Sequence, residues 1–289
     1  MEISLKDVSL TYMKNTPFEK VAIERINITI PSQKIIGIIG HTGSGKSSLI
    51  QLIGGLLLPT SGSIKVGPYE WGSKKNKILA ELRKHVGVVF QYPEYQLFEE
   101  TVEKDIAFAP RNFGVSESEI TKVVKEAMEL VKLSYENYSK RSPFELSGGQ
   151  MRRAAIAGVI AANPDVLILD EPTAGLDPKG RKEILRMITD LHHTRSMTTI
   201  IISHSMDEIA AMVDQIFVLS NGEVILDGNP DKVFQQIELL RENGLDIPEI
   251  TKFINKLNSS LNLELPLNCY TMECLEEQIF HYLQKGNKR

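Results

Sequence analysis

Apolar and polar residues alternate in two segments near the N-terminus. The alternation runs through residues 3–12, with one irregularity, and returns over residues 26–30. A period of two places one face of a strand against a core and the other face in water. We expect these strands, which a connection containing Pro17 separates, to form an antiparallel edge region.

Three later segments are apolar nearly throughout. Residues 34–39, 166–169 and 199–202 consist mostly of isoleucine, leucine and valine. Strands of this kind are covered by helices on both faces, as in a parallel sheet. The first runs through a glycine-rich turn into a helix over Lys46–Ile53, and an amphipathic helix over 178–191 separates the other two. The pattern predicts an α/β fold with a parallel core sheet.

Helical patterns interrupt and follow this core. Residues 100–162 are mostly helical in pattern, which predicts a helical subdomain over about 92–162. After a hairpin with its turn at Asn221-Gly222, the pattern becomes helical again. Thr271 is the predicted N-cap of the last of these helices.

The chain therefore divides into two predicted units. Residues 1–235 form the core unit, and residues 236–289 form a C-terminal helical appendage. The appendage contains few apolar residues, so we expect it to pack against the core or a partner rather than fold alone.

Composition excludes some classes of protein. The 33 Lys and Arg residues do not outnumber the 37 Asp and Glu residues, so the net charge of −4 gives nucleic-acid binding no support. Apolar runs fall well short of the roughly 20 residues of a membrane-spanning helix, and the N-terminus lacks the pattern of a secretory signal. Cys269 and Cys274 have no second pair beside them, and we expect two reduced thiols in an intracellular protein.

A phosphate-binding loop follows the first buried strand. Residues 40–47 match G-x-x-x-x-G-K-S between a strand and a helix. Backbone N–H groups of such a loop converge on a phosphate, Lys46 would reach the β and γ oxygens, and Ser47 would offer its hydroxyl to Mg²⁺. A dinucleotide site is disfavoured because Ser48 stands where the third glycine belongs. The predicted binding residues are Gly40, His41, Thr42, Gly43, Ser44, Gly45, Lys46, Ser47 and Ser48.

Two carboxylates follow the second buried strand. Asp170 and Glu171 come at its carboxyl end, where α/β proteins place ligands. Solvated acids at a strand end would be the ordinary interpretation, but the upstream phosphate loop favours a site. Asp170 would hold Mg²⁺, and Glu171 would act on the hydrolytic water as general base or positioning group.

A third motif lies at residues 146–150, Leu-Ser-Gly-Gly-Gln. Ser147 and Gln150 have the spacing of a capping box that opens a helix. Two glycines in a first helical turn are costly unless something approaches the backbone, so a second anion site is the alternative. Two phosphate-binding elements in one chain suggest that each nucleotide is shared between two chains.

The order of these motifs, with Gln91, Asp177 and His204, resembles the nucleotide-binding domain of ABC transporters over about residues 2–235. The resemblance implies a P-loop NTPase of ABC type with an antiparallel β edge region and a helical subdomain. It also implies that the chain hydrolyses ATP with Mg²⁺.

The resemblance assigns further roles. Tyr12 would stack on adenine, Asp177 would lie at a dimer interface, and His204 would contact the γ-phosphate. Taken alone, Tyr12 would be read as core packing and His204 as structural. The implied γ-phosphate grip on the partner's nucleotide consists of Ser147, Gly148, Gly149 and Gln150. The implied catalytic residues are Glu171, His204 and Gln91, and the implied metal ligands are Ser47, Gln91 and Asp170.

Two stretches narrow the family. Residues 15–20 and 91–105 are similar to the second of the two paralogous ATPases of energy-coupling-factor (ECF) importers for vitamins or metal ions. This similarity implies a head-to-tail dimer with a paralogous ATPase (a homodimer being the alternative), and a dimerising appendage. It also implies a transmembrane coupling subunit, an indirectly linked substrate-binding membrane subunit, and a peripheral location at the cytoplasmic face of the cell membrane. Another ABC importer class, or a soluble non-transport ABC ATPase, remains open at this point.

Acidic residues gather beside Gln91. The twelve residues from 94 to 105 contain Glu94, Glu99, Glu100, Glu103 and Asp105. A solvated helix start is one interpretation. The other is an acidic docking groove for a basic helix of the membrane subunit.

Overall fold

Two β-sheets form the centre of the chain in the computed structural model, which describes residues 1–74 and 77–286. The larger sheet has the strand order β10-β9-β3-β8-β7-β6. Its strands are β3 (Ile35–Gly40), β6 (Val86–Val89), β7 (Val166–Asp170), β8 (Thr198–Ile202), β9 (Gln215–Ser220) and β10 (Glu223–Gly228). The smaller sheet has the order β2-β1-β4-β5. Its strands are β1 (Ile3–Tyr12), β2 (Lys20–Ile30), β4 (Ser61–Val66) and β5 (Tyr69–Trp71).

The parallel sheet follows the predicted pattern. β3, β7 and β8 are buried along their whole length, which explains their continuous apolar sequences. β3 pairs with β8 and β8 with β7 in parallel, so Gly40 and Asp170 emerge at the same edge of the sheet. The chain therefore delivers the phosphate loop and the acidic pair to one place.

The N-terminal strands form an antiparallel pair with register shifts between Leu5 and Thr11, in agreement with the predicted irregularity. They belong to a separate sheet with β4 and β5, two strands that the sequence pattern did not predict. One apolar cluster fills the space between this sheet, the helix α1 (Lys46–Ile53) and one face of the parallel sheet.

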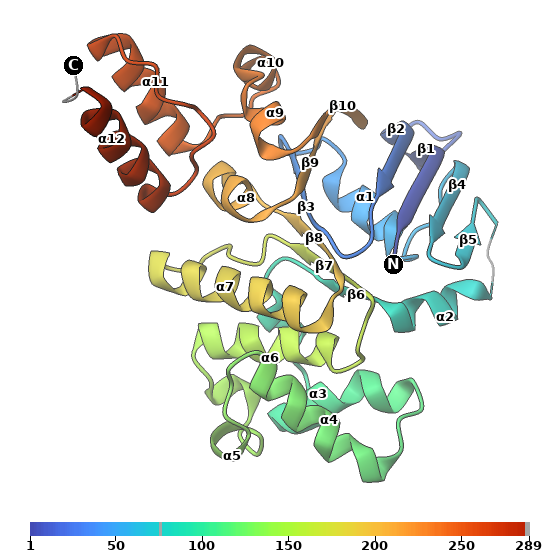
Figure 1. The fold of residues 1–289 in the computed structure, drawn as a ribbon. Helices are drawn as coiled ribbons and strands as arrows, with labels where there is room; N and C mark the ends of the chain where they lie inside the picture. The colour runs from blue at the N-terminus through green and yellow to red at the C-terminus, as the bar shows by residue number, and fades with distance from the viewer. Residues whose placement is uncertain (75–76, 287–289) are drawn as a thin grey trace.

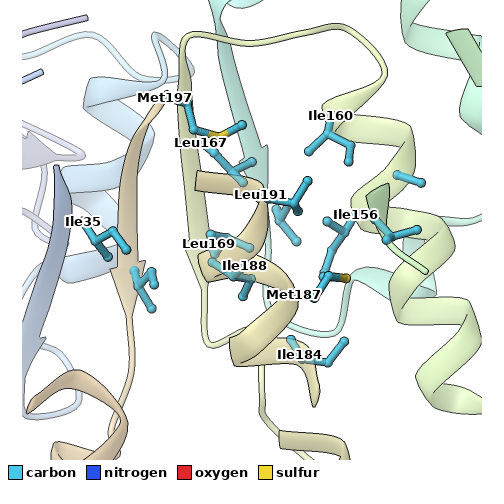
Figure 2. Packing of buried hydrophobic residues seen from close by; sticks show 14 of the residues in the cluster. Ile35, Ile156, Ile160, Leu167, Leu169, Ile184, Met187, Ile188, Leu191 and Met197 are labelled. Carbon is cyan, nitrogen blue, oxygen red and sulfur yellow. The ribbon is translucent and has the colours of Figure 1, made fainter. Parts of the chain in front are cut away.

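A second apolar cluster covers the opposite face of the parallel sheet. Helix α7 (Pro178–Arg195) places Ile184, Ile188 and Leu191 between β7 and helix α6 (Gly148–Ile160), as Figure 2 shows. This layer joins the sheet to the helical subdomain. The helical elements between residues 92 and 160 are η1 (Pro93–Gln96), α3 (Val102–Asn112), α4 (Glu117–Leu130), α5 (Tyr135–Tyr138), η2 (Pro143–Glu145) and α6.

The remaining helices lie around the sheets and at the C-terminal end (Figure 1). They are α2 (Ile78–His85), α8 (Met206–Met212), α9 (Pro230–Phe234), α10 (Ile237–Glu242), α11 (Glu249–Leu261) and α12 (Met272–Gly286). In the part of the chain that the structure describes, every helix is too short or too polar to traverse a lipid bilayer.

Helices α11 and α12 have a small core of their own. Its buried residues are Ile254, Leu265, Cys269 and Leu275. Cys269 and Cys274 form a disulfide, so the expectation of two reduced thiols is wrong. The turn into α12 folds the chain back, because Thr271 Oγ1 accepts a hydrogen bond from the Cys274 N–H at 3.2 Å, and this brings the two side chains together.

Apolar packing and hydrogen bonds join the appendage to the rest of the chain. Leu240, Leu245 and Ile247 belong to the apolar cluster that covers the α7 face of the sheet, and the Tyr270 ring contacts Phe234. Tyr270 Oη donates to Asp231 Oδ1 at 2.8 Å, and the Glu249 N–H donates to Asp207 Oδ1 at 2.8 Å. Burial, and then the bond to Asp231, raise the pKa of the Tyr270 phenol, which therefore stays protonated. Residues 287–289 of the predicted appendage lie outside the described residues.

The layer between α6 and β7 gives a first prediction. Ile188 is fully buried there, and Ile188→Ala should lower the free energy of unfolding by about 2–5 kcal/mol, because it removes apolar contacts and leaves a cavity. Urea unfolding followed by circular dichroism measures the change. Lys182→Ala, on the exposed side of the same helix, is the control and should unfold close to the unchanged protein. An equal effect of the two substitutions would contradict the packing described here.

Candidate functional site

The phosphate loop has a backbone that its glycines make possible. Gly43 and Gly45 have φ values of 85° and 106°, in the left-handed region that favours glycine. A Cβ atom on Gly45 would also lie 2.6 Å from the Ala22 carbonyl oxygen. The loop ends where α1 begins, at Lys46, so the N–H groups of the first helical turn face the same concave surface.

Lys46 is held inside this loop. Its Nζ donates to the carbonyl oxygens of Gly40 at 2.7 Å and His41 at 2.9 Å. Burial lowers the pKa of Lys46, while the charges of Glu171 and Asp170 act in the opposite direction. The ammonium group is thus bound by neutral carbonyls, which a phosphate oxygen with a full charge would outcompete.

Asp170 ends β7 opposite the loop. Ser47 Oγ donates to Asp170 Oδ2 at 3.4 Å. Burial raises the pKa of Asp170, and the neighbouring Glu171 charge adds to this shift. A hydroxyl and a carboxylate are the hard oxygen donors that suit Mg²⁺, so the residues present fit this ion.

Glu171 is bound on both sides. Gln91 Nε2 donates to its Oε2 at 2.8 Å, and His204 Nε2 lies 2.6 Å from its Oε1. The three side chains follow three different strands, β6, β7 and β8, so the parallel sheet brings them together. Glu171 also has a φ of 49°, a strained backbone for a residue with a side chain, and strain of this kind concentrates at functional sites.

Tyr12 lies at the mouth of a small cleft beside the phosphate loop. The cleft has a volume of about 180 Å³, and its lining includes Tyr12, Lys20, Gly43 and Ser48. Tyr12 Oη and Ser48 Oγ are 3.1 Å apart, and 37% of the tyrosine is exposed, so it is not a core residue. An exposed ring next to a phosphate loop offers a surface on which a base can stack.

The 147–150 motif forms the predicted capping box, and its two glycines are open to solvent. Ser147 and Gln150 form a capping box, with the Ser147 N–H bonded to Gln150 Oε1 at 2.9 Å. Gly148 and Gly149 face open space, since a Cβ on either would meet nothing within 4 Å among the described residues. None of the hydrogen bonds in the described residues connects this motif with the phosphate loop of the same chain.

Two other predicted residues have local contacts. Asp177 is the N-cap of α7, where its Oδ1 accepts from the Gly180 N–H at 2.6 Å. His41 Nδ1 lies 2.9 Å from the Thr42 carbonyl oxygen, so the ring is engaged within the loop.

Two residues of the site, Glu208 and Arg152, were not identified from the sequence. Glu208 Oε2 accepts from Thr173 Oγ1 at 2.9 Å and from Ser203 Oγ at 3.1 Å, which ties the segment after Glu171 to the one before His204. The capping spacing of Ser205 and Glu208 was a visible signal for the start of α8, though not for this contact. Arg152 is the other, and its partners are 20 to 58 positions away in the sequence.

Most acids of the stretch beside Gln91 have partners within the chain, and an apolar cleft lies next to them. Four of the five acids are engaged within the chain, as follows: Glu94 with Arg152, Glu100 with Lys104, Glu103 with Lys140, and Asp105 with the N–H groups of Phe98 and Glu99. The neighbouring cleft of about 230 Å³ is lined by Leu97, Phe98 and Phe108, with Arg83 and Lys84 also on its wall. The cleft is therefore mainly apolar, with Arg83, Lys84 and Asp105 on its wall, and docking of a basic helix on the acids stays a prediction.

The chain is similar to known proteins over most of its length. A model of the ABC transporter family matches residues 23–174. The energy-coupling factor transporter ATP-binding protein EcfA2 of Clostridium perfringens is 50% identical over 99% of this chain and 100% of its own length. The corresponding protein of Enterococcus faecalis is 48% identical over 100% of this chain and 99% of its own.

Solved structures are similar as well. The structure of cbiO1 from Clostridium perfringens, part of the ABC transporter complex cbiONQ, has a TM-score of 0.74 and 36% identity and covers 88% of this chain and 98% of its own. The dimeric post-hydrolysis structure of the ATP-binding cassette MJ0796, bound to ADP and Pi, has a TM-score of 0.70 and 28% identity and covers 79% and 98%. The chain therefore belongs to the ABC transporter family and, within it, to the energy-coupling factor transporter ATP-binding proteins.

Proposed function

We propose that this chain powers an energy-coupling factor importer by hydrolysing ATP, with Glu171 acting on the attacking water as general base or positioning group. The observation that carries this proposal is the Glu171 carboxylate, bound between Gln91 and His204 at the sheet edge where the phosphate loop also ends. Family membership makes the chain an ATPase of an ECF importer. The assignment of individual residues to steps is our proposal.

Each residue of the site has a separate role in this proposal. Lys46 and the loop N–H groups would bind the phosphates of ATP, and Tyr12 would carry the base. Mg²⁺, held by Ser47 and Asp170 with Gln91 close by, would supply positive charge against the phosphate oxygens. His204 would exchange its contact with Glu171 for the γ-phosphate, which frees Glu171 Oε1 for water.

The second phosphate-binding motif calls for a second subunit. The open N–H groups of Gly148 and Gly149 would bind the γ-phosphate held by another ATPase, and Asp177 would lie at that interface. The partner is a paralogous ATPase in our proposal, with a homodimer as the alternative. Residues 1–235 act as the nucleotide-binding domain, and residues 236–289 act as a pairing appendage that exposes Phe253 and Phe280.

The membrane partners would meet the chain at the apolar cleft. Phe98 and Phe108 contact each other edge to face there and both are exposed. A helix of the transmembrane coupling subunit with an apolar face would fit it, and a substrate-binding membrane subunit would select the vitamin or metal ion. The chain would then work as a peripheral subunit at the cytoplasmic face of the cell membrane.

Glu171→Gln tests the hydrolytic role. The variant should bind ATP as well as the unchanged chain but lose about 10²–10⁴-fold in turnover, because an amide accepts no proton. Phosphate release by the assembled complex and binding of a fluorescent nucleotide measure the two effects. Glu223→Gln, an exposed carboxylate on β10, is the control. Near-normal turnover of Glu171→Gln would end this assignment.

Tyr12 gives a test of base stacking. Tyr12→Ala should weaken ATP binding about 5- to 150-fold, since stacking a base on an aromatic ring contributes about 1–3 kcal/mol. Tyr12→Phe loses the Ser48 contact but keeps the ring, and should bind nearly normally. Titration with a fluorescent ATP analogue measures both. Equal losses in the two variants would assign the binding to the hydroxyl and not to the ring.

The cleft gives a test of membrane coupling. Phe98→Ser with Phe108→Ser should reduce co-purification with the membrane subunits, because it removes the apolar contact surface while leaving the phosphate loop intact. Leu56→Ser replaces an exposed apolar residue outside the cleft and should co-purify normally. Unchanged recovery of the double variant would place the coupling subunit elsewhere.

A further inference from the structure

Arg152 is a buried cation whose guanidinium donates four hydrogen bonds within the described part of the chain. Only 2% of the residue is exposed. Nε and Nη2 donate to Glu94 Oε2 and Oε1 at 3.1 and 2.7 Å, in a paired arrangement. Nη1 donates to the carbonyl oxygens of Pro172 at 3.1 Å and Ala174 at 2.7 Å. Removing one partner from such a group would leave a buried charge without compensation.

The two sets of partners belong to different parts of the site. Glu94 lies in η1, between Gln91, which binds Glu171, and the residues Leu97 and Phe98, which line the apolar cleft. Pro172 and Ala174 directly follow Glu171, the strained residue of the site. Arg152 therefore connects the wall of the cleft with the loop that carries Glu171.

The same loop is held from its other side. Between the two carbonyls bound by Arg152, Thr173 Oγ1 donates to Glu208, which also binds Ser203 next to His204. Residues 172–174 are thus bonded alternately to α6 and to α8. A displacement of α6 relative to the sheet must shift this loop or break its bonds to Arg152.

We propose that Arg152 is a positioning residue that couples occupancy of the cleft to hydrolysis. Glu94 transmits a displacement of the cleft wall to the guanidinium, and the guanidinium sets the path of residues 172–174 and with it the Glu171 carboxylate. This inference rests on the proposed function, because it takes the membrane coupling subunit as the occupant of the cleft.

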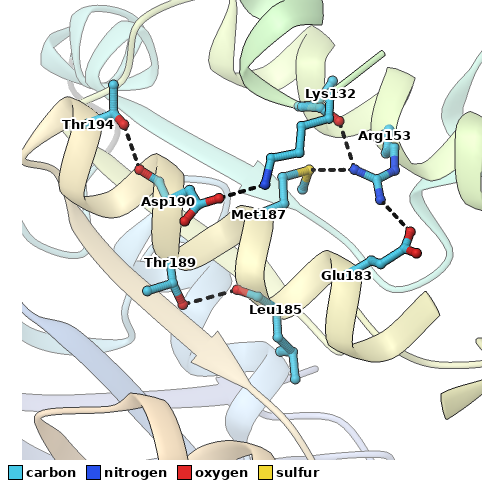
Figure 3. A network of polar contacts seen from close by, with 9 residues as sticks. Lys132, Arg153, Glu183, Leu185, Met187, Thr189, Asp190 and Thr194 are labelled. Carbon is cyan, nitrogen blue, oxygen red and sulfur yellow. Dashed lines mark hydrogen bonds and ion pairs between the residues drawn. The ribbon is translucent and has the colours of Figure 1, made fainter. Parts of the chain in front are cut away.

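The neighbouring residue provides a matched control. Arg153 stands on the same helix and is also held by a carbonyl and a carboxylate, donating to the Val131 oxygen at 2.9 Å and to Glu183 Oε2 at 3.0 Å (Figure 3). These partners lie in the helical subdomain and on α7, away from Glu171 and the cleft. Substituting it disturbs a second arginine ion pair, which is more exposed than that of Arg152 with Glu94, without touching the proposed connection.

The test uses the complete chain, both in the ATPase dimer alone and in the complex with its membrane subunits. Arg152→Lys keeps the charge, but one ammonium cannot serve four acceptors in a plane. It should lower the ATP turnover of the complex by about 10- to 100-fold, the effect of a misplaced catalytic group, with nucleotide affinity unchanged. Glu94→Gln should reduce the ratio of stimulated to basal turnover, and the double variant should be no worse than Arg152→Lys. Arg153→Lys should keep both rates.

Several outcomes would overturn the proposal. One is a lower thermal midpoint of Arg152→Lys, together with stimulated and basal rates that fall by the same factor as those of Arg153→Lys. That result would show a structural effect only. Additive effects of Arg152→Lys and Glu94→Gln would show that the two do not act as one unit. If Arg152→Lys does not fold, the stimulation ratio of Glu94→Gln decides alone. Absence of stimulation in the unchanged complex would instead refute the proposed membrane coupling, while the turnover of Arg152→Lys in the dimer still tests the positioning of Glu171.

Discussion

The parallel pairing of β3, β8, β7 and β6 fixes where every reactive group of this molecule can lie. Parallel strands end at a common edge, so Gly40, Asp170 and the residues after β6 and β8 emerge within reach of one another. Side chains of these strands pack into apolar clusters on both faces, so a shift in register would require repacking on both sides of the sheet. The apolar clusters on the two faces of the sheet thus maintain the site.

The loop that carries Glu171 is held mainly by side chains from distant segments. Glu171 has an unfavourable backbone conformation, and interactions elsewhere must compensate its cost of about 1–3 kcal/mol. These interactions come from Gln91 after β6, His204 after β8, Arg152 in α6 and Glu208 in α8. Because these elements belong to both the core and the helical subdomain, the conformation of the loop depends on the relative position of these two parts.

The sequence predicted most accurately those elements that depend on local patterns. The buried strands, the phosphate loop and the helix after it depend on residues next to one another, and each is found where its pattern placed it. Short strands such as β4 and β5 were missed because a few residues give little periodicity. Arg152 and Glu94 could not be paired from the sequence, since 58 positions separate them and an isolated arginine on a helix ordinarily faces water. The cysteine expectation failed because the turn that joins Cys269 to Cys274 depends on the packing of a small core. A charge count also does not show which acids have partners within the fold, as Glu94 has in Arg152.

The separate core of α11 and α12 has a consequence for the dynamics of the chain. With four buried residues in the described part of the chain, it contributes far less apolar burial than the clusters around the sheets. Hydrogen bonds of Glu249 and Tyr270 and the contact of Tyr270 with Phe234 connect it to them. Such a unit opens at a lower free energy than the global unfolding of the protein. Its amide hydrogens therefore exchange with solvent through local opening while those of β3, β7 and β8 remain protected, and the appendage can change its packing without loss of the ATP site.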